Sequence, residues 1–239
     1  MCSDGLRFFG VARMKPILYL IPTPLGAPDT PCLLPHEQQA IVGLTDFVVE
    51  AEKTARSHLK HLGVTTPIRE LNLQTLNEHT DLKTLPELLK PLQEGRSMGI
   101  VSEAGCPAVA DPGANLVALA HKHGFEVRPL VGPSSLLLAL MASGANGQNF
   151  AFKGYLPSEK NERIQRLKAL EQRSRQQNET QLFIETPFKK IAVSSRRIKR
   201  IFYRIQFLEN LRILILLLSI LKLCEVLNLK MARRFQLNG

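Results

Sequence analysis

Residues 99–113, GIVSEAGCPAVADPG, combine the features that a ligand site at the end of a strand requires. Ile100 and Val101 end a short apolar run, and a loop of small residues and two prolines follows. Glycine permits positive φ and close backbone approach, whereas proline fixes φ and removes a donor. Two carboxylates, Glu103 and Asp111, lie in this otherwise neutral loop. The pattern predicts a ligand lying against exposed backbone, and the alternative is an ordinary connection between a strand and a helix.

Two other stretches also end a strand in proline and glycine. The apolar run at 15–21, KPILYLI, predicts a buried strand, and PTPLGAP after it predicts a rigid loop. The run at 125–130 predicts another strand, which leads through VGPSS into an apolar helix with Ser134 placed to cap it. A helix N-terminus with a hydroxyl and free amides suits an anionic group, although capping alone also accounts for Ser134.

Several common chemistries lack their motifs. No two glycines are separated by a single residue, so the G-x-G-x-x-G fingerprint is missing, and no G-K-[ST] phosphate loop occurs. Ser134 and Ser135 lack the G-x-S-x-G elbow of a nucleophilic serine, and Cys106 has no evident histidine partner. The sequence therefore disfavours the common nucleotide folds and nucleophilic catalysis.

Metal and disulfide chemistry are disfavoured as well. His58 and His61 lie three residues apart on a predicted helix, and His121 and His123 lie two apart, but neither pair has a convincing third ligand. The four cysteines show no C-x-x-C spacing, which predicts neither a zinc site nor a disulfide framework. We therefore expect no metal and a reducing, cytoplasmic setting.

The elements that position these loops alternate between strand and helix. Apolar runs predict strands at 15–21, 47–49, 68–71, 96–101, 125–130 and 181–185. Helical spacing of apolar residues, or dense charge in the last case, predicts helices within 35–47, 50–62, 82–92, 114–123, 136–144 and 158–177. In the second of these helices Glu52 and Arg56 lie four residues apart and face the same way. The alternation predicts a parallel, helix-covered sheet whose ligand sites lie beyond the carboxyl ends of the strands.

The predicted domain organisation has four parts. Residues 1–13 are expected to form a loose extension, because no secretory signal is evident there. An N-terminal α/β domain is predicted over 14–146, and a C-terminal α/β domain begins over 147–188. The stretch 144–157 is rich in glycine, asparagine and aromatic residues and is interpreted as the crossing between the two domains.

The tail at 189–239 differs in composition from everything before it. It holds 12 of the 31 basic and 2 of the 21 acidic residues, so 1–188 holds 19 of each and the whole net charge of +10 belongs to the tail. The body therefore has no electrostatic footprint for a polyanion. The apolar stretch at 213–221 is about half as long as a membrane span. We expect no transmembrane span, and a basic amphipathic helix on a membrane or a partner remains an alternative.

Turn residues also disappear in the tail: 189–238 contains no glycine and no proline, whereas 1–188 contains 14 glycines and all 15 prolines. We hypothesise that the tail is translated from a shifted reading frame. Sequencing the gene tests this hypothesis. One base inserted or removed near codon 189 should restore an α/β pattern with glycine and proline, and failure to do so contradicts the hypothesis.

Together, IPTPLG at 21–26, VSEAGCPAVADPG at 101–113 and VGPSS at 131–135 resemble the tetrapyrrole methylase superfamily of S-adenosylmethionine-dependent methyltransferases. Within it, the chain is most similar to the branch related to ribosomal RNA small subunit methyltransferase I, which methylates a ribose 2′-hydroxyl. The resemblance covers 14–188. It implies a two-domain α/β homodimer, with a parallel-sheet N-terminal domain and a C-terminal α/β domain that is incomplete here.

The resemblance also implies S-adenosylmethionine as cofactor, bound in the cleft between the domains. The residues implied to contact it lie in the same loops: Pro22, Thr23, Pro24, Gly26, Gly105, Cys106, Pro107, Ala108, Val109, Ser134 and Ser135. The methyl acceptor it implies is RNA. The alternatives are a small-molecule methyltransferase acting on a tetrapyrrole-like acceptor, and a cofactor-binding remnant without activity. The neutral net charge of 1–188 disfavours an RNA acceptor, whereas the resemblance to the ribosomal RNA branch favours one.

The chain departs from the family pattern in two segments, which leaves the identity of the methyl acceptor open. Glu103 and Cys106 differ from the S-D-A-G-T-P pattern of the ribosomal RNA enzymes, and EAEKTAR at 50–56 differs from their E-D-T-R segment. Transfer of a methyl group to a hydroxyl requires alignment and removal of a proton. Glu103, Glu50, Glu52 and Arg56 are candidates to act near the acceptor, and no spacing argument selects among them.

Overall fold

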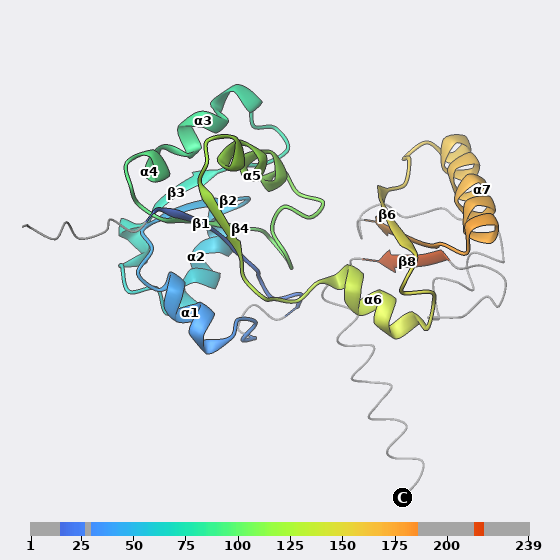
Figure 1. The fold of residues 1–239 in the computed structure, drawn as a ribbon, viewed down its shortest axis with the longest axis horizontal. Coiled ribbons are helices and arrows are strands. Elements are labelled where there is room, and N and C mark those ends of the chain that lie inside the picture. The colour runs from blue at the N-terminus through green and yellow to red at the C-terminus, as the bar shows by residue number, and fades with distance from the viewer. Residues whose placement is uncertain (1–14, 27–29, 186–212, 218–239) are drawn as a thin grey trace, which may run out of the picture. The chain divides into compact units, whose positions relative to one another are not determined.

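The structure, a computed structural model, describes residues 15–26 and 30–185 together with the backbone of 213–217 (Figure 1). The extension predicted at 1–13 and the rest of the tail at 189–239 lie outside the described residues. The contacts divide the chain into two units. Unit 1 lies within 1–22, 33–103 and 107–131, and unit 2 within 23–32, 104–106 and 132–239. The predicted domain boundary after residue 146 stays a prediction.

Unit 1 is built on a five-stranded parallel sheet, as the alternation of strands and helices predicts. Its strands are β1 (Ile17–Ile21), β2 (Asp46–Val49), β3 (Asn72–Thr75), β4 (Met98–Val101) and β5 (Glu126–Pro129), in the order β3-β2-β4-β1-β5. Val101 at the end of β4 is in register with Ile21 of β1 and with Val49 of β2. The residues that follow these three strands therefore leave the sheet at the same edge.

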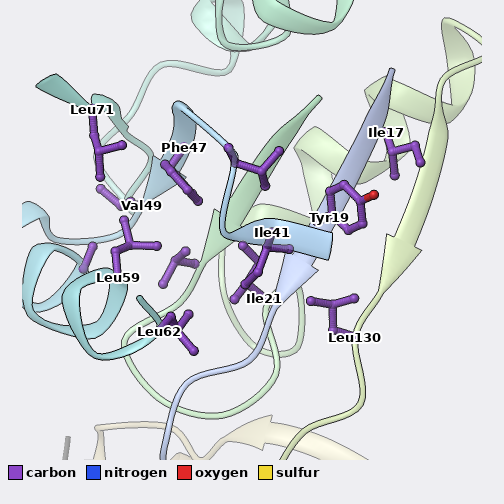
Figure 2. Packing of buried hydrophobic residues seen from close by; sticks show 13 residues of the cluster. Ile17, Tyr19, Ile21, Ile41, Phe47, Val49, Leu59, Leu62, Leu71 and Leu130 are labelled. Carbon is purple, nitrogen blue, oxygen red and sulfur yellow. The ribbon is translucent and has the colours of Figure 1, made fainter. Parts of the chain in front are cut away.

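Helices cover both faces of this sheet because its three central strands, β1, β2 and β4, are buried on both sides. They are α1 (Pro35–Ile41), α2 (Glu52–His61), α3 (Leu85–Leu88), α4 (Lys90–Gln93) and α5 (Gly113–Lys122). Ile17, Tyr19 and Ile21 of β1 join one core cluster with residues of α1 and α2 (Figure 2). Leu18, between them, joins a second cluster with residues of α3, α4 and α5. The period of two along β1 thus places α1 and α2 on one face and α3 to α5 on the other.

Two predicted elements of unit 1 are wrong in detail. The strand predicted at 68–71 is instead a 3-10 helix, Ile68–Glu70, after Pro67, and the strand β3 begins at Asn72. The single helix predicted at 82–92 is divided into a 3-10 turn, Leu82–Thr84, followed by α3 and α4. Prolines stand in the first turns of both short helices, where no amide donor is needed, and a proline cannot continue the helix that precedes it.

Unit 2 has a three-stranded parallel sheet, β6-β7-β8. It comprises α6 (Ser135–Ser143), β6 (Phe150–Tyr155), α7 (Lys160–Gln177), β7 (Thr180–Glu185) and β8 (Ile213–Leu217). The stretch 144–157, interpreted from the sequence as a crossing, contains β6, so that interpretation is wrong over six residues. The strand was not predicted because glycine and asparagine are typical of turns and loops. The backbone of β8, from the tail, pairs with β7.

Helix α7 packs on the sheet of unit 2 through a small cluster of Leu156, Leu170 and Phe183. Glu179, just before β7, binds Arg173 of this helix through two hydrogen bonds of 2.7 and 3.1 Å. Those bonds, together with one from Gln181, lower the pKa of Glu179 to about 2. The clamp fixes the end of α7 to the start of β7. No helix among the described residues is long and apolar enough to cross a membrane.

Candidate functional site

The loops after β1 and β4 are joined by a two-way backbone contact. The amide of Thr23 donates to the carbonyl of Gly105 at 2.9 Å, and the amide of Gly105 donates back to the carbonyl of Thr23 at 3.1 Å. Gly105 has a φ of +77°, and a Cβ there would lie 3.1 Å from Leu25 Cδ2 and 3.4 Å from the carbonyl oxygen of Pro133. Glycine is therefore favoured at this position by its positive φ, and an added Cβ would also be tight against the Leu25 side chain.

The third loop lies against the second through Cys106. Its Sγ lies 3.3 Å from the carbonyl oxygen of Pro133, and burial raises the pKa of the thiol, so the S–H donates. Unit 2 thus brings together Thr23, Gly105, Cys106 and Pro133, one or more from each of the three loops singled out in the sequence. The first two loops meet through main-chain groups alone, and the third is joined by the Cys106 thiol.

Two polar features of this cluster differ from expectation. Ser134 precedes α6, but its side chain accepts no capping hydrogen bond, so the predicted cap is wrong and the hydroxyl is not used in that way. Thr23 is 4% exposed, and its Oγ1 is buried without a hydrogen-bond partner among the described residues. An orphaned buried hydroxyl is unfavourable unless a ligand completes it. These residues therefore fit a bound cofactor with polar groups.

The rest of the second loop is held in unit 1 by Asp111. Its carboxylate accepts hydrogen bonds from the amides of Ala108, at 2.9 Å, and Gly113, at 2.7 Å. Burial raises the pKa of Asp111 in spite of these bonds. Ala108 and Ala110 have φ angles of +63° and +60°, a region that alanine rarely adopts. The strained turn exposes the side chain of Val109, at 47%, between them.

Two of the four catalytic candidates, Glu50 and Glu103, lie together at the carboxyl ends of β2 and β4. The amide of Glu103 donates to Glu50 Oε2 at 3.4 Å, across 53 residues of sequence. Burial raises the pKa of Glu50, and the nearby charges of Glu103 and Asp111 raise it further, against the lowering effect of the amide hydrogen bond. The surroundings of Glu50 therefore favour the protonated form more than water does.

A small hollow at this sheet edge is lined by residues from both strands and from the loop, among them Glu50, Ser102 and Asp111. Its volume of about 10 Å³ admits about one water molecule. The connections leave β2 and β4 toward opposite faces of the sheet, which makes this a topological switch point, a place where α/β proteins commonly bind ligands.

The other two candidates, Glu52 and Arg56, are occupied with one another. Arg56 Nη2 donates to Glu52 Oε2 at 2.9 Å, and its Nη1 donates to the carbonyl of Ile68 at 2.9 Å. The pair confirms the expected i, i+4 contact. Its bonds connect α2 to the following 3-10 helix, which is a structural role.

Sequence reasoning missed two residues of α2 that contact the loops. The hydroxyl of Thr54 is hydrogen-bonded to Glu103 Oε1. His58 is 6% exposed, and its Nε2 lies 3.2 Å from the carbonyl oxygen of Pro22. Their spacing of four residues places them on one face of the helix, and that spacing was the signal available. In the part of the chain that the structure describes, no cluster of His, Cys, Asp and Glu suits a metal ion.

Comparison with known proteins gives a consistent set of relatives. The chain is 36% identical over 157 residues to ribosomal RNA small subunit methyltransferase I of Mesorhizobium japonicum, covering 66% of this chain and 51% of that protein. The namesake of Micromonospora olivasterospora is 34% identical over 191 residues, covering 80% and 57%. That of Thermotoga maritima is 41% identical over 115 residues, covering 48% and 50%. No family model matches the chain.

These relatives are named as methyltransferases of ribosomal RNA. The chain is related to the ribosomal RNA small subunit methyltransferase I proteins, as the three loops predicted. It spans about half the length of the curated relatives it matches.

Two solved structures are also similar. The methyltransferase CobJ matches with a TM-score of 0.48 and 20% identity, covering 80% of this chain and 77% of that one. The uroporphyrin-III-C-methyltransferase of Thermus thermophilus matches with a TM-score of 0.40 and 20% identity, covering 60% and 65%.

Proposed function

We propose that this chain binds S-adenosylmethionine through the three loops and transfers its methyl group to a ribose 2′-hydroxyl of small-subunit ribosomal RNA. The observation that carries the proposal is the convergence of Thr23, Gly105 and Cys106 with Pro133 through backbone and thiol contacts. The names of the relatives support methyl transfer and a ribosomal RNA acceptor. They give no support to the tetrapyrrole-like acceptor.

The cofactor residues proposed are those that the resemblance implies. Thr23 Oγ1 offers a buried hydroxyl that has no partner within the described part of the chain, and Gly105 offers a main chain that no Cβ shields. When bound, S-adenosylmethionine supplies an electrophilic methyl group on a sulfonium. The loops then hold the cofactor so that an acceptor oxygen can approach in line, which contributes to the rate by positioning.

An RNA acceptor is supported by the distribution of charge on α7. Between Lys160 and Gln177 this helix carries six basic and two acidic residues. Lys160, Arg166 and Lys168 are exposed and make no ion pair among the described residues. Phosphate groups attract such a surface without sequence preference.

We extend the proposal to a homodimer, which sedimentation of the full chain tests.

Calorimetry of the full chain with S-adenosylmethionine tests cofactor binding. We expect saturable heat with a Kd on the order of 10 μM. Gly105→Ala should weaken binding at least about tenfold, because it introduces a Cβ beside Leu25 and Pro133 at a positive φ. Gly124→Ala is the matched control: its φ of +74° imposes the same strain, with nothing within 4 Å of the added Cβ. No heat with the parent chain, or equal weakening by both variants, contradicts the proposal.

Transfer of labelled methyl groups from S-adenosylmethionine to small ribosomal subunits tests the acceptor. We expect the label in RNA, in a dinucleotide that resists alkali, because methylation of the 2′-hydroxyl removes the nucleophile for strand cleavage. Label on a base, or only on an added tetrapyrrole, contradicts the ribose assignment. Binding of the cofactor without any transfer identifies the chain as a remnant.

A further inference from the structure

Helix α2 contacts both the first and the second loop through one of its faces. Thr54 and His58 are four residues apart, so their side chains lie one above the other on the helix surface. Thr54 reaches Glu103 after β4, and His58 reaches Pro22 after β1. The two loops that these contacts hold are the ones joined by the Thr23–Gly105 bridge.

The hydroxyl of Thr54 suits a carboxyl that changes its protonation. It has one proton and two acceptors within reach, the Glu103 carboxylate and the carbonyl of Ala51 at 3.1 Å. With Glu103 ionised, the hydroxyl donates to the carboxylate. With Glu103 protonated, the hydroxyl turns to Ala51 and accepts from the carboxylic acid. Either state of Glu103 is hydrogen-bonded, so taking up a proton leaves no unsatisfied group.

His58 holds the first loop in a different way. A carbonyl oxygen can only accept, so Nε2 carries the proton and donates to Pro22. Nδ1 is buried without a partner among the described residues. Burial lowers the pKa of His58, and His61 lowers it further, so the neutral ring is the form that fits. The contact fixes the carbonyl that immediately precedes Thr23.

We propose that α2 holds the first two loops in place, and we call this role of the helix the shared mount. Thr54 positions Glu103 as the group that takes the proton of the acceptor hydroxyl. His58 positions the Pro22–Gly26 loop. The inference rests on the proposed function and assigns two roles within it. Glu103 stands two residues before Gly105, so the chain itself keeps their Cα atoms within about 7 Å. Glu103 is thereby linked through the chain itself to the proposed cofactor loop.

The proposed methyl and proton transfers conserve atoms and charge. The acceptor oxygen forms a bond to the methyl carbon, and its proton passes to the Glu103 carboxylate. The carbon–sulfur bond breaks with its electron pair on sulfur. A positive sulfonium and a negative carboxylate become a neutral thioether and a neutral carboxylic acid, so no other reactant is needed.

The Thr54 role is tested by separating turnover from binding. Thr54→Val should lower kcat at least about tenfold, since a misplaced proton acceptor loses much of the 10²–10⁴-fold that such a group contributes. The Kd for S-adenosylmethionine should stay within about twofold, and Thr54→Ser should restore kcat. An unchanged kcat in Thr54→Val, or a serine variant as slow as the valine variant, overturns the assignment of Thr54.

The His58 role predicts the opposite separation. His58→Leu removes the donor to Pro22 at similar volume and should raise the Kd for S-adenosylmethionine at least about tenfold, because the first loop loses its anchor. His58→Gln, whose amide can donate from a similar place, should recover most of the affinity. His61→Leu, on an exposed part of the same helix, is the matched control and should leave it unchanged. Equal effects at positions 58 and 61 overturn the assignment.

Amide hydrogen exchange tests the mount without activity or cofactor. In His58→Leu the amides of Thr23 and Gly105 should exchange at least about tenfold faster, while the amide of Leu76, bonded to Val49, should keep its rate. If all three accelerate alike, His58 is only a core residue and the mount is refuted. If the parent chain neither binds nor transfers but the exchange result holds, the proposed function fails and the mount stands.

Discussion

Asp46 begins β2 with a carboxylate that is almost wholly buried, its side chain being 4% exposed. It accepts hydrogen bonds from Thr45 Oγ1 at 2.7 Å, Asn72 Nδ2 at 2.8 Å and Arg96 Nε at 3.2 Å. Burial by itself raises the pKa of Asp46, but these bonds outweigh it and the pKa lies below its usual value. One side chain thus connects the starts of β2 and β3 with Arg96, two residues before β4, at the edge of the sheet opposite the loops.

Asp46→Asn should lower the free energy of unfolding by about 2 kcal/mol at neutral pH. The substitution replaces a carboxylate oxygen, which accepts hydrogen bonds from two donors, with an amide NH₂ group that is itself a donor. The half-exposed Arg96 side chain keeps the loss at that modest size. The folded pKa is depressed, so the contribution of Asp46 is present above the unfolded pKa and is lost as pH falls through the folded one. Urea unfolding should therefore show a constant difference at pH 5–8 that shrinks below about pH 4. A difference that persists at pH 2 contradicts this account.

At the scale of elements, Gly99 determines how closely side chains of the neighbouring strands pack over β4. A Cβ at Gly99 would lie 2.6 Å from Ile21 Cδ1 and 2.9 Å from Phe47 Cδ1. Both side chains belong to the buried cluster between the sheet and α2 (Figure 2). The glycine therefore lets large residues of β1 and β2 fill the space over the middle strand. The same strands deliver Pro22 and Glu50 to the site.

Gly99→Ala should lower the free energy of unfolding by about 1–3 kcal/mol, because the added methyl group overpacks a filled core. Gly43→Ala is its control, since a Cβ there meets nothing within 4 Å and the backbone needs no positive φ. We expect that variant to be neutral or slightly more stable than the parent chain. Thermal or urea unfolding measures both, and equal stability of the two variants contradicts the packing argument.

At the scale of the whole molecule, charge is distributed unevenly although 1–188 is neutral in total. Helix α7 carries six basic and two acidic residues, and its other face packs on Leu156 and Phe183. The sum over 1–188 therefore conceals a local surface suited to phosphate. Residues 1–188 as a whole are neutral, whereas α7 alone carries an excess of positive charge.

Charge reversal on α7 should weaken RNA binding by the full chain and reduce its dependence on salt. With Arg166→Glu and Lys168→Glu combined, the slope of log affinity against log salt should fall by about 1.4 or more in magnitude. Reversal of Lys83 and Lys122, two exposed lysines of unit 1, is the control and should change neither quantity. Filter binding over a range of salt measures both. Equal effects of the two pairs would assign the RNA affinity to overall charge.

The sequence by itself determined the local features of this protein. Strand and helix alternate because apolar periodicity is a property of short segments, and glycine and proline mark the three loops because turn conformations are local. Prediction failed for two different reasons. The strand at 150–155 forms because β7, a distant segment, pairs with it. The helix predicted at 82–92 is divided by Pro86 and Pro91, a local signal that apolar periodicity alone does not take into account.

Only the tertiary structure decided which residues meet at the site. Glu50 lies beside Glu103 because β4 is inserted next to β2, and no local pattern encodes that order. Thr54 and His58 look like ordinary polar residues of a helix until the loops after β4 and β1 arrive against them. Such contacts depend on the packing of segments distant in sequence, whereas the chemical groups of each loop are set by its own residues.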